Sequence, residues 1–269
     1  MSIFRSSIAV ILHTVSRTVA ARTCADGPAD TIRLMLTEAA ALAAGGGFLA
    51  AYAVGCPASQ LLGRTVFRGP RSSRRIALTF DDGPSDWTPA VLDVLASFQV
   101  TATFFVCGRN AERQPELMQS LASAGHEVGN HTYSHPCLLL HSARTAEDEI
   151  RRTQRIIGET AGVVPKWFRP PYGVRAPGLR RILPALDLTS VLWTAIGNDW
   201  KCKADQIVAR VLRKTANGGI ICLHDGDRAD GTAERRETVK AVKRIIPELH
   251  SQGFEFVTVS SLLSQPASA

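Results

Sequence analysis

Short apolar runs alternate with amphipathic stretches from Arg75 to the C-terminal region. The run from Arg75 to Phe80 (RIALTF) is typical of a buried strand, and Thr88 to Phe98 has the apolar spacing of a helix. Further strands are predicted at 102–106, 127–129, 166–169, 190–194, 219–223 and 254–259, and further helices at 115–124, 145–160, 204–214 and 233–249. Because strands and helices follow one another in turn, we expect a single α/β domain whose parallel sheet is covered by helices, either open or closed into a barrel.

Residues 1–63 do not show the alternation of strands and helices, and they include a long uncharged stretch. The stretch from Ala39 to Gly63 contains no charged residue and is long enough to cross a bilayer, for which about 20 apolar residues are needed. It is also rich in Ala and Gly, which transfer weakly into lipid. Two interpretations follow: membrane contact through residues 39–63, or a helix that packs on the catalytic domain. We therefore divide the chain into an N-terminal helical segment, 1–63, and a catalytic domain, 64–269.

Composition narrows the function classes. Hydrophobic residues make up 45% and charged residues 20% of the chain, which indicates a globular protein rather than a disordered one. The net charge of +7 is compatible with polyanionic surroundings, but it is better explained as a general property of the surface than as a substrate-binding feature. No zinc-finger spacing, RNA-binding aromatic signature or long basic tract is present, so no nucleic-acid partner is predicted. None of the six cysteines forms a C-x-x-C pair, which argues against a structural zinc knuckle or a thioredoxin-like site.

Polar residues that can bind a metal follow two of the predicted strands. Asp81 and Asp82 come directly after the first strand, where two adjacent carboxylates repel each other unless a cation or a proton offsets the charge. Taken alone, they could equally cap a helix. His131 and His135 follow the third strand and would share one face if the segment were helical, although unrelated surface histidines often have this spacing. Together these nitrogen and oxygen donors indicate a catalytic divalent metal.

Three further strand ends carry polar groups. Arg169 follows the fourth strand and precedes two prolines, Asp199 lies near the fifth strand, and His224 leaves the sixth beside Asp225. A histidine in this position is a candidate general acid. Each group also has a structural interpretation, as a solvated arginine on a rigid turn or as a structural histidine.

In this order, the motifs resemble the polysaccharide deacetylase family, also called carbohydrate esterase family 4 or the NodB-homology domain. The matching segments are TFDDGPS at 79–85, HTYSH at 131–135, RPPYG at 169–173, NDW at 198–200 and LHDG at 223–226. The resemblance covers about Arg74 to Leu263. It implies a distorted (β/α) barrel with an extra N-terminal helical segment, and a hydrolase that removes acetyl groups from an N-acetylated or O-acetylated polysaccharide or oligosaccharide, such as chitooligosaccharide or peptidoglycan.

The resemblance also implies roles for individual residues. Asp82, His131 and His135 would hold a divalent metal, most often zinc, with cobalt able to substitute. Asp81 would be the general base that activates the attacking water. His224 would be the general acid that protonates the leaving amine.

Supporting roles are implied in the same way. Arg169 would orient the base, and Asp199 would pair with the acid. The backbone N–H of Tyr172 would stabilise the oxyanion, while Trp200 and Leu223 would line the pocket for the acetyl methyl group.

Two alternatives and one departure remain. A phosphotransferase of the haloacid-dehalogenase type needs a second Asp where this chain has Gly83. A catalytically inactive carbohydrate-binding or scaffold protein on the same fold is the main alternative, and the joint presence of base, ligands and acid argues against it.

Many family members carry an acidic residue where this chain has Ile196, so the fourth motif matches only in part. The sequence favours a membrane-associated or cell-envelope location over the cytoplasm and leaves the oligomeric state open.

Overall fold

A computed structural model describes residues 45–47, 49, 51–227 and 234–264 of the chain. The chain divides into two compact units, Met1–Ala51 and Tyr52–Ala269, and the second unit holds every strand and motif described below.

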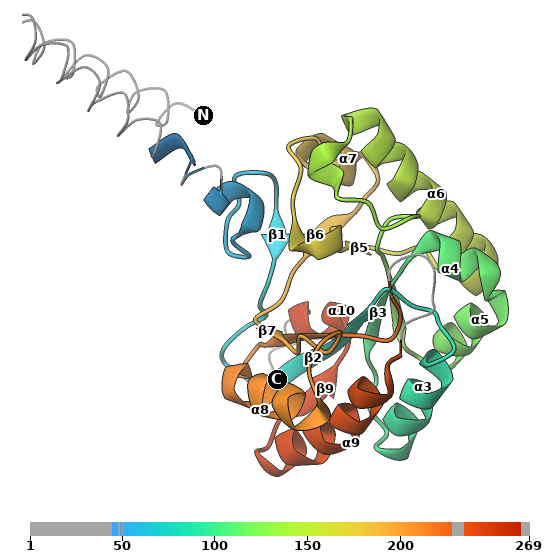
Figure 1. Ribbon diagram of the computed structural model, residues 1–269, viewed down its shortest axis with the longest axis vertical. Helices are drawn as coiled ribbons and strands as arrows, with labels where there is room; N and C mark the ends of the chain where they lie inside the picture. The colour runs from blue at the N-terminus through green and yellow to red at the C-terminus, as the bar shows by residue number, and fades with distance from the viewer. Residues whose placement is uncertain (1–44, 48, 50, 228–233, 265–269) are drawn as a thin grey trace, which may run out of the picture. The chain divides into compact units, whose positions relative to one another are not determined.

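The second unit is built on a curled, wholly parallel sheet (Figure 1). In the described part of the chain its strands are β1 Thr65–Val66, β2 Arg75–Asp81, β3 Thr103–Val106, β4 Glu127–Asn130, β5 Trp167–Phe168, β6 Thr189–Val191, β7 Ala195–Ile196, β8 Ile220–His224 and β9 Glu255–Val257. Their spatial order is β1-β6-β5-β4-β3-β2-β8-β7, and β9 pairs with the start of β2. The predicted distorted (β/α) barrel is therefore confirmed, as a sheet curled into part of a barrel.

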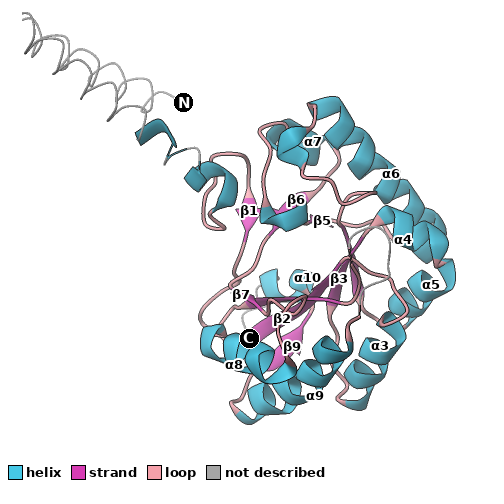
Figure 2. Ribbon diagram, viewed as in Figure 1, coloured by secondary structure: helices cyan, strands magenta, loops and turns pink. Residues whose placement is uncertain are grey.

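Helices lie on the outside of this sheet (Figure 2). They are α3 Thr88–Ser97, α4 Gly108–Arg113, α5 Pro115–Ser123, α6 Ala143–Ala161, α7 Leu179–Ala185, α8 Ala204–Lys214, α9 Arg236–Ser251 and α10 Val259–Leu263, with short 3-10 turns at Leu138–Leu140 and Pro171–Gly173. The longest of them, α6, begins at Ser142, whose side chain accepts a hydrogen bond from the Thr145 N–H, and ends at Gly162 in a left-handed conformation.

The two faces of β2 have different roles, because one packs in the hydrophobic core and the other carries polar side chains into the curl of the sheet. Side chains alternate along a strand, so Ile76, Leu78 and Phe80 belong to the core packed under the outer helices. Thr79 and Asp81 lie on the opposite face, inside the curl, and both are buried. Asp81 thus enters the interior of the half-barrel at the carboxyl end of its strand, where active sites of such folds form.

The predicted elements occur with small shifts in their ends, but the histidine segment differs from one expectation. Residues 131–135 form an irregular turn rather than a helix, and Thr132 and His135 have positive φ angles of 66° and 58°. The turn, and not helical periodicity, brings the two histidines together. The short strands β1 and β7 and helices α4, α7 and α10 were not predicted, because each is too short to show a clear hydrophobic period.

The segment before the sheet also differs from the expectation of a helix that runs to residue 63. The chain is helical at 51–55, but residues 56–63 form turns against Arg175, whose guanidinium donates to backbone carbonyl groups there. None of the helices among the described residues is long and apolar enough to cross a membrane. Most of the predicted helical segment, residues 1–44, 48 and 50, lies outside the described residues.

Candidate active site

The motif residues converge on one cavity at the carboxyl ends of the strands. It has a volume of about 610 Å³ and is lined by Asp81, Asp82, His131, His135, Tyr172, Gly173, Trp193, Ile196, Trp200, His224, Asp227, Glu234 and Arg235. The lining residues lie at or after the ends of β2, β4, β5, β6, β7 and β8, so six separate strand ends supply the site. Parallel pairing brings these ends to the same edge of the sheet.

Asp82, His131 and His135 form a compact group of possible metal ligands. The Nε2 atoms of His131 and His135 lie 3.4 Å and 3.2 Å from Oδ1 of Asp82. All three residues are buried, and within the described part of the chain Oδ1 of Asp82 accepts no hydrogen bond. Such an orphaned buried carboxylate oxygen, facing two imidazole nitrogens, fits a site for a divalent cation.

The protonation of these groups also fits a cation. Burial, together with the positive field of His131, lowers the pKa of His135 to about 4, so its imidazole is neutral at physiological pH. Burial opposes ionisation of Asp82, but the nearby histidines, His131 first, hold its pKa well below the usual range. The Nδ1–H of His131 donates to the carbonyl oxygen of Arg169 at 2.7 Å, which leaves Nε2 free to bind a metal.

Asp81 has a different set of partners from its neighbour Asp82. Nη1 of Arg169 donates to Oδ1 of Asp81 at 2.6 Å and to the Thr79 hydroxyl at 2.8 Å. Arg169 is fully buried, and its guanidinium lies 4.0 Å from the ring centroid of Phe105. This pair holds the Asp81 carboxylate in one orientation while its other oxygen, Oδ2, lies 4.0 Å from Nε2 of His131.

His224 is held from behind by Asp199. Oδ1 of Asp199 accepts from Nδ1 of His224 at 2.8 Å, and Oδ2 accepts from the His224 backbone N–H and the Thr238 hydroxyl, each at 2.8 Å. Burial alone would lower the pKa of His224, but the Asp199 carboxylate outweighs it and raises that pKa to about 9. The imidazole is therefore protonated at neutral pH.

A second group of potential ligands, Asp81, Cys222 and His224, lies in the same cavity wall. Its members are already engaged: Arg169 binds Asp81, Asp199 binds His224, and the Cys222 thiol donates to Oδ2 of Asp81 at 3.4 Å. Burial, reinforced by the Asp81 charge, raises the pKa of the Cys222 thiol well above its usual range. A cation here would have to displace protons beside a buried guanidinium, so this group is better suited to carrying protons than to binding a metal.

The remaining predicted site residues occupy different depths. Tyr172 and Trp200 line the cavity, are about half exposed at 52% and 47%, and contact the rings of His135 and His224 respectively. Leu223 is fully buried and does not line the cavity. Its side chain lies beneath Gly197, where it would block an added Cβ atom at 2.4 Å.

Sequence reasoning did not identify several residues that shape the site. Trp193, Asp227, Glu234 and Arg235 line the cavity but belong to no motif. Thr238 supports Asp199 from helix α9. A tryptophan near the carboxyl end of the strand predicted at 190–194 was a usable signal for Trp193, whereas the others are polar residues on surface-like stretches that only the fold brings inward.

Glu149 is a further residue that the sequence did not single out. It lies on helix α6, and its carboxylate accepts hydrogen bonds from the Tyr133 N–H at 2.9 Å, the Ser134 N–H at 2.7 Å and the Ser134 hydroxyl at 2.8 Å. These groups sit between His131 and His135, so one helix side chain holds the turn that carries both histidines.

Comparison with known proteins decides the family. Residues 68–191 match the family model described as polysaccharide deacetylase. The chain is 39% identical over 205 residues to a peptidoglycan-N-acetylglucosamine deacetylase of Bacillus cereus, covering 73% of this chain and 71% of the relative. The chain belongs to the polysaccharide deacetylase family. A chitooligosaccharide deacetylase of Sinorhizobium fredii is also 39% identical, over 71% of this chain and 93% of that protein.

Solved structures of other polysaccharide deacetylases share the fold. A peptidoglycan N-acetylglucosamine deacetylase in complex with 4-naphthalen-1-yl-N-oxidanyl-benzamide superposes with a TM-score of 0.70 at 36% identity, covering 74% of this chain and 92% of that one. A CE4 family pseudoenzyme from Bacillus anthracis has a TM-score of 0.69 at 27% identity, covering 74% and 69%. The family therefore holds proteins described as enzymes and one described as a pseudoenzyme, and the site residues of each chain must be examined individually.

Proposed function

We propose that this chain is a metal-dependent hydrolase that removes the acetyl group from N-acetylated sugar residues of a cell-wall or related polysaccharide. The observation that carries the proposal is the coexistence, in one cavity, of a ligand group, a base and an acid. The ligand group is Asp82 with two histidines, the base is Asp81 fixed by an arginine, and the acid is His224 fixed by Asp199. Curated relatives over most of the chain carry the names of deacetylases for peptidoglycan and chitooligosaccharide.

Asp82, His131 and His135 would hold the divalent cation, since their three donor atoms face one another and are otherwise unused. When bound there, such a cation lowers the pKa of a water molecule and polarises a carbonyl oxygen. We infer zinc as the usual occupant, because two imidazoles and one carboxylate with an open position are typical of catalytic zinc sites.

Asp81 would act as the general base. Arg169 engages its Oδ1, and Oδ2 faces the metal-ligand group, as its 4.0 Å separation from Nε2 of His131 shows. The arginine holds the carboxylate in one rotamer, so Oδ2 is oriented to take a proton from an attacking water. The Cys222 thiol is only a weak donor to the same oxygen.

His224 would act as the general acid. Asp199 binds its Nδ1, so the protonated Nε2 is the atom available to a leaving amine. A pKa of about 9 keeps the proton on the ring until the carbon–nitrogen bond breaks. An amine is a poor leaving group without this proton, which is why the acid matters more for an amide than for an activated ester.

The Tyr172 backbone N–H would donate to the developing oxyanion. Tyr172 has φ of 60°, and its N–H makes no hydrogen bond within the described part of the chain. An N–H that is fixed before the reaction begins stabilises negative charge without reorganisation. Trp200 and Trp193 offer aromatic surface for the sugar and the acetyl methyl group in the same cavity.

Acetate release with controlled metal content tests the proposal. Purified protein should release acetate from chitin oligosaccharides or peptidoglycan, lose this activity after exhaustive chelation, and regain it when zinc or cobalt is added back. Activity that survives complete chelation would contradict the metal-dependent mechanism. No acetate from any acetylated substrate, from protein that binds zinc, would favour an inactive carbohydrate-binding protein instead.

The same assay resolves the substrate class. We propose an N-acetylated glucosamine polymer, because the relatives named above act on N-acetylglucosamine in peptidoglycan or on chitooligosaccharides. Acetylated xylan is the comparison substrate for O-deacetylation. A higher kcat/KM on xylan than on the amino-sugar polymers would assign the site to esters. A cell-envelope location follows from a cell-wall substrate and is part of this proposal.

A further inference from the structure

Arg175, three residues after Tyr172, is a buried cation with an unusual set of partners. Only 1% of its surface is exposed, and no carboxylate lies within ion-pair distance of it in the described part of the chain. Burial lowers its pKa from the ordinary value for arginine. A buried charge is costly unless hydrogen bonds compensate it, so the partners of this guanidinium identify what it holds.

All of these partners belong to the segment Tyr52–Val66, which we call the strap. Nη1 of Arg175 donates to the Ser59 carbonyl at 2.5 Å and to the Thr65 hydroxyl at 3.4 Å. Nη2 donates to the Cys56 carbonyl, and both Nε and the backbone N–H of Arg175 donate to the carbonyl of Val54. A single side chain therefore holds several carbonyl groups of the strap, in addition to the turn hydrogen bonds within the strap itself.

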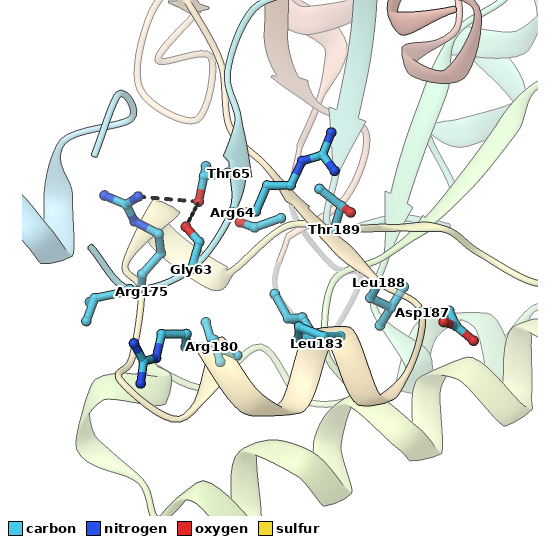
Figure 3. A pocket seen from close by; sticks show the side chains of 13 residues that line it. Gly63, Arg64, Thr65, Arg175, Arg180, Leu183, Asp187, Leu188 and Thr189 are labelled. Carbon is cyan, nitrogen blue, oxygen red and sulfur yellow. Dashed lines mark hydrogen bonds between the residues drawn. The ribbon is translucent and has the colours of Figure 1, made fainter. Parts of the chain in front are cut away.

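The strap is also closed on itself and on the sheet. Gln60 accepts from the Thr65 N–H and donates to the Thr65 carbonyl, each at 2.9 Å, and β1 then pairs with β6. Figure 3 shows Arg175 reaching Thr65 at one side of a cavity of about 390 Å³ between the strap and helix α7. The guanidinium groups of Arg64 and Arg180 point in different directions there, so these two charges do not converge on one point of the cavity.

The other end of this arrangement is the loop that carries Tyr172. A positive φ is strained for a residue with a side chain and persists only where the surroundings fix it. Immediately after Tyr172, Gly173 packs so closely on Trp193 that an added Cβ atom would meet the indole at 2.7 Å. Two residues further along the chain, Arg175 is bound to the strap through both its backbone and its side chain.

We propose that Arg175 is a positioning residue that makes the strap part of the active site. By clamping Tyr52–Val66 to the loop at 171–175, it fixes the conformation of Tyr172 and so the direction of the backbone N–H. The proposal rests on the oxyanion role given to that N–H above. The family match covers residues 68–191, so it includes Arg175 but not the strap that Arg175 holds.

Substitutions in the full-length chain test this role. We would compare Arg175→Met and Arg175→Lys with the matched control Arg180→Met, an exposed arginine on the same cavity. The measurements are kcat and KM on a chitin oligosaccharide, zinc affinity by chelator competition, and hydrogen exchange of peptides covering 52–66 and 171–175.

For Arg175→Met we expect faster exchange in both peptides and a kcat reduced by roughly tenfold to a hundredfold, because a small displacement of a catalytic group has this effect. KM and zinc affinity should stay unchanged. Arg175→Lys should recover part of kcat, because it keeps the charge and some of the hydrogen bonds, and Arg180→Met should behave as wild type.

Other results would overturn the proposal. Faster exchange in 52–66 alone, with wild-type kcat, would mean that Arg175 merely anchors the strap. Zinc affinity that falls together with kcat would indicate general damage to the fold. If Arg175→Met does not fold, Gln60→Ala opens the strap without altering the buried cation, and wild-type kcat in that variant would also contradict the proposal. A wild-type protein without deacetylase activity would refute the proposed function. Hydrogen exchange of the peptide 171–175 in the Arg175 variants would still show whether Arg175 holds this loop.

Discussion

Asp81 and Asp82, the two adjacent carboxylates of the first motif, contact different partners. Asp81 lies on the inner face of β2 and binds the buried Arg169, while Asp82, just past the strand, has φ of 75° and turns toward His131 and His135. Gly83 then passes so close to the buried Asp225 carboxylate that any side chain would collide with it. Two neighbouring carboxylates can thus serve as base and ligand because the backbone turns sharply between them.

The division of roles predicts that Asp81→Asn separates metal binding from turnover. The amide keeps the shape of the carboxylate but cannot accept a proton, so we expect unchanged zinc content and a loss of activity on the order of 10²-fold or more. Asp86→Asn, an exposed aspartate in the same loop, is the control and should be fully active. Near wild-type activity in the Asp81 variant would show that another group is the base.

The acid role of His224 predicts a dependence on the leaving group. His224→Ala should reduce hydrolysis of an N-acetyl sugar by roughly 10²-fold, and should affect a nitrophenyl acetate ester much less, since that alcohol departs without a proton. His141→Ala, an exposed histidine, is the control. Equal losses on the two substrates would indicate that His224 serves binding or structure instead.

The pKa of His224 adds a pH prediction for the wild-type enzyme. Asp199 overcomes the effect of burial and raises this pKa from 6.5 to about 9, so the acid is protonated below that value and loses its proton above it. We therefore expect kcat/KM on the amide to fall as the pH rises through about 9. The alkaline limb should be absent for His224→Ala, and an identical limb in that variant would assign it to another group.

Among the helices, α6 supports the metal ligands most directly. His131 and His135 lie in an irregular turn with two positive φ angles, which has little conformational preference of its own. Glu149 compensates by accepting three hydrogen bonds from Tyr133 and Ser134 inside this turn. The geometry of the ligands therefore depends on a helix that is adjacent to the turn in sequence and packs beside it.

This dependence predicts the effect of removing Glu149. Glu149→Ala should weaken zinc affinity by roughly tenfold, the lower end of the usual effect of outer partners of metal ligands. Glu149→Gln should retain most of the affinity, because its carbonyl oxygen still accepts both backbone N–H bonds. The control is Glu147→Ala on the same helix, which removes only an exposed ion pair with Arg151. Equal zinc affinities for Glu149→Ala and wild type would contradict the prediction.

At the scale of the whole molecule, the boundary of the catalytic unit matters for function. The sequence predicted a catalytic domain that starts at Arg64, and this division stays a prediction. The compact unit begins at Tyr52, because Arg175 and the pairing of β1 with β6 tie the strap to the rest. Residues Met1–Ala51 contribute none of the groups described at the site.

We therefore expect a chain that begins at Tyr52 to fold and to keep the full deacetylase activity. A chain that begins at Arg68 should lose the strap, with a lower kcat and a lower melting temperature. Each 1 kcal/mol of lost stability lowers Tm by roughly 2–4 °C in a unit of this size. Thermal melts and acetate release on both chains measure this, and equal kcat values would show that the strap has no part in catalysis.

The sequence alone predicted most strands of the sheet and the motif residues that converge on the cavity. Buried parallel strands need continuous apolar runs, and catalytic groups follow them directly, so both leave a local record in the sequence. Arg75–Asp81 and Ile220–His224 are examples, each an apolar run that ends in a reactive residue. The pairs Arg169–Asp81 and Asp199–His224, inferred from family resemblance, are present at 2.6 Å and 2.8 Å.

Only the tertiary structure decided how the supporting residues are used. Glu149, Thr238 and Arg175 lie on stretches that read as surface helices or loops, and nothing local distinguishes them from solvated neighbours such as Glu147 or Arg180. Their partners are mostly backbone groups and turn residues elsewhere in the chain. Such hydrogen bonds require a specific distance rather than a residue pattern, and that distance exists only once the sheet has curled and the helices have packed around it.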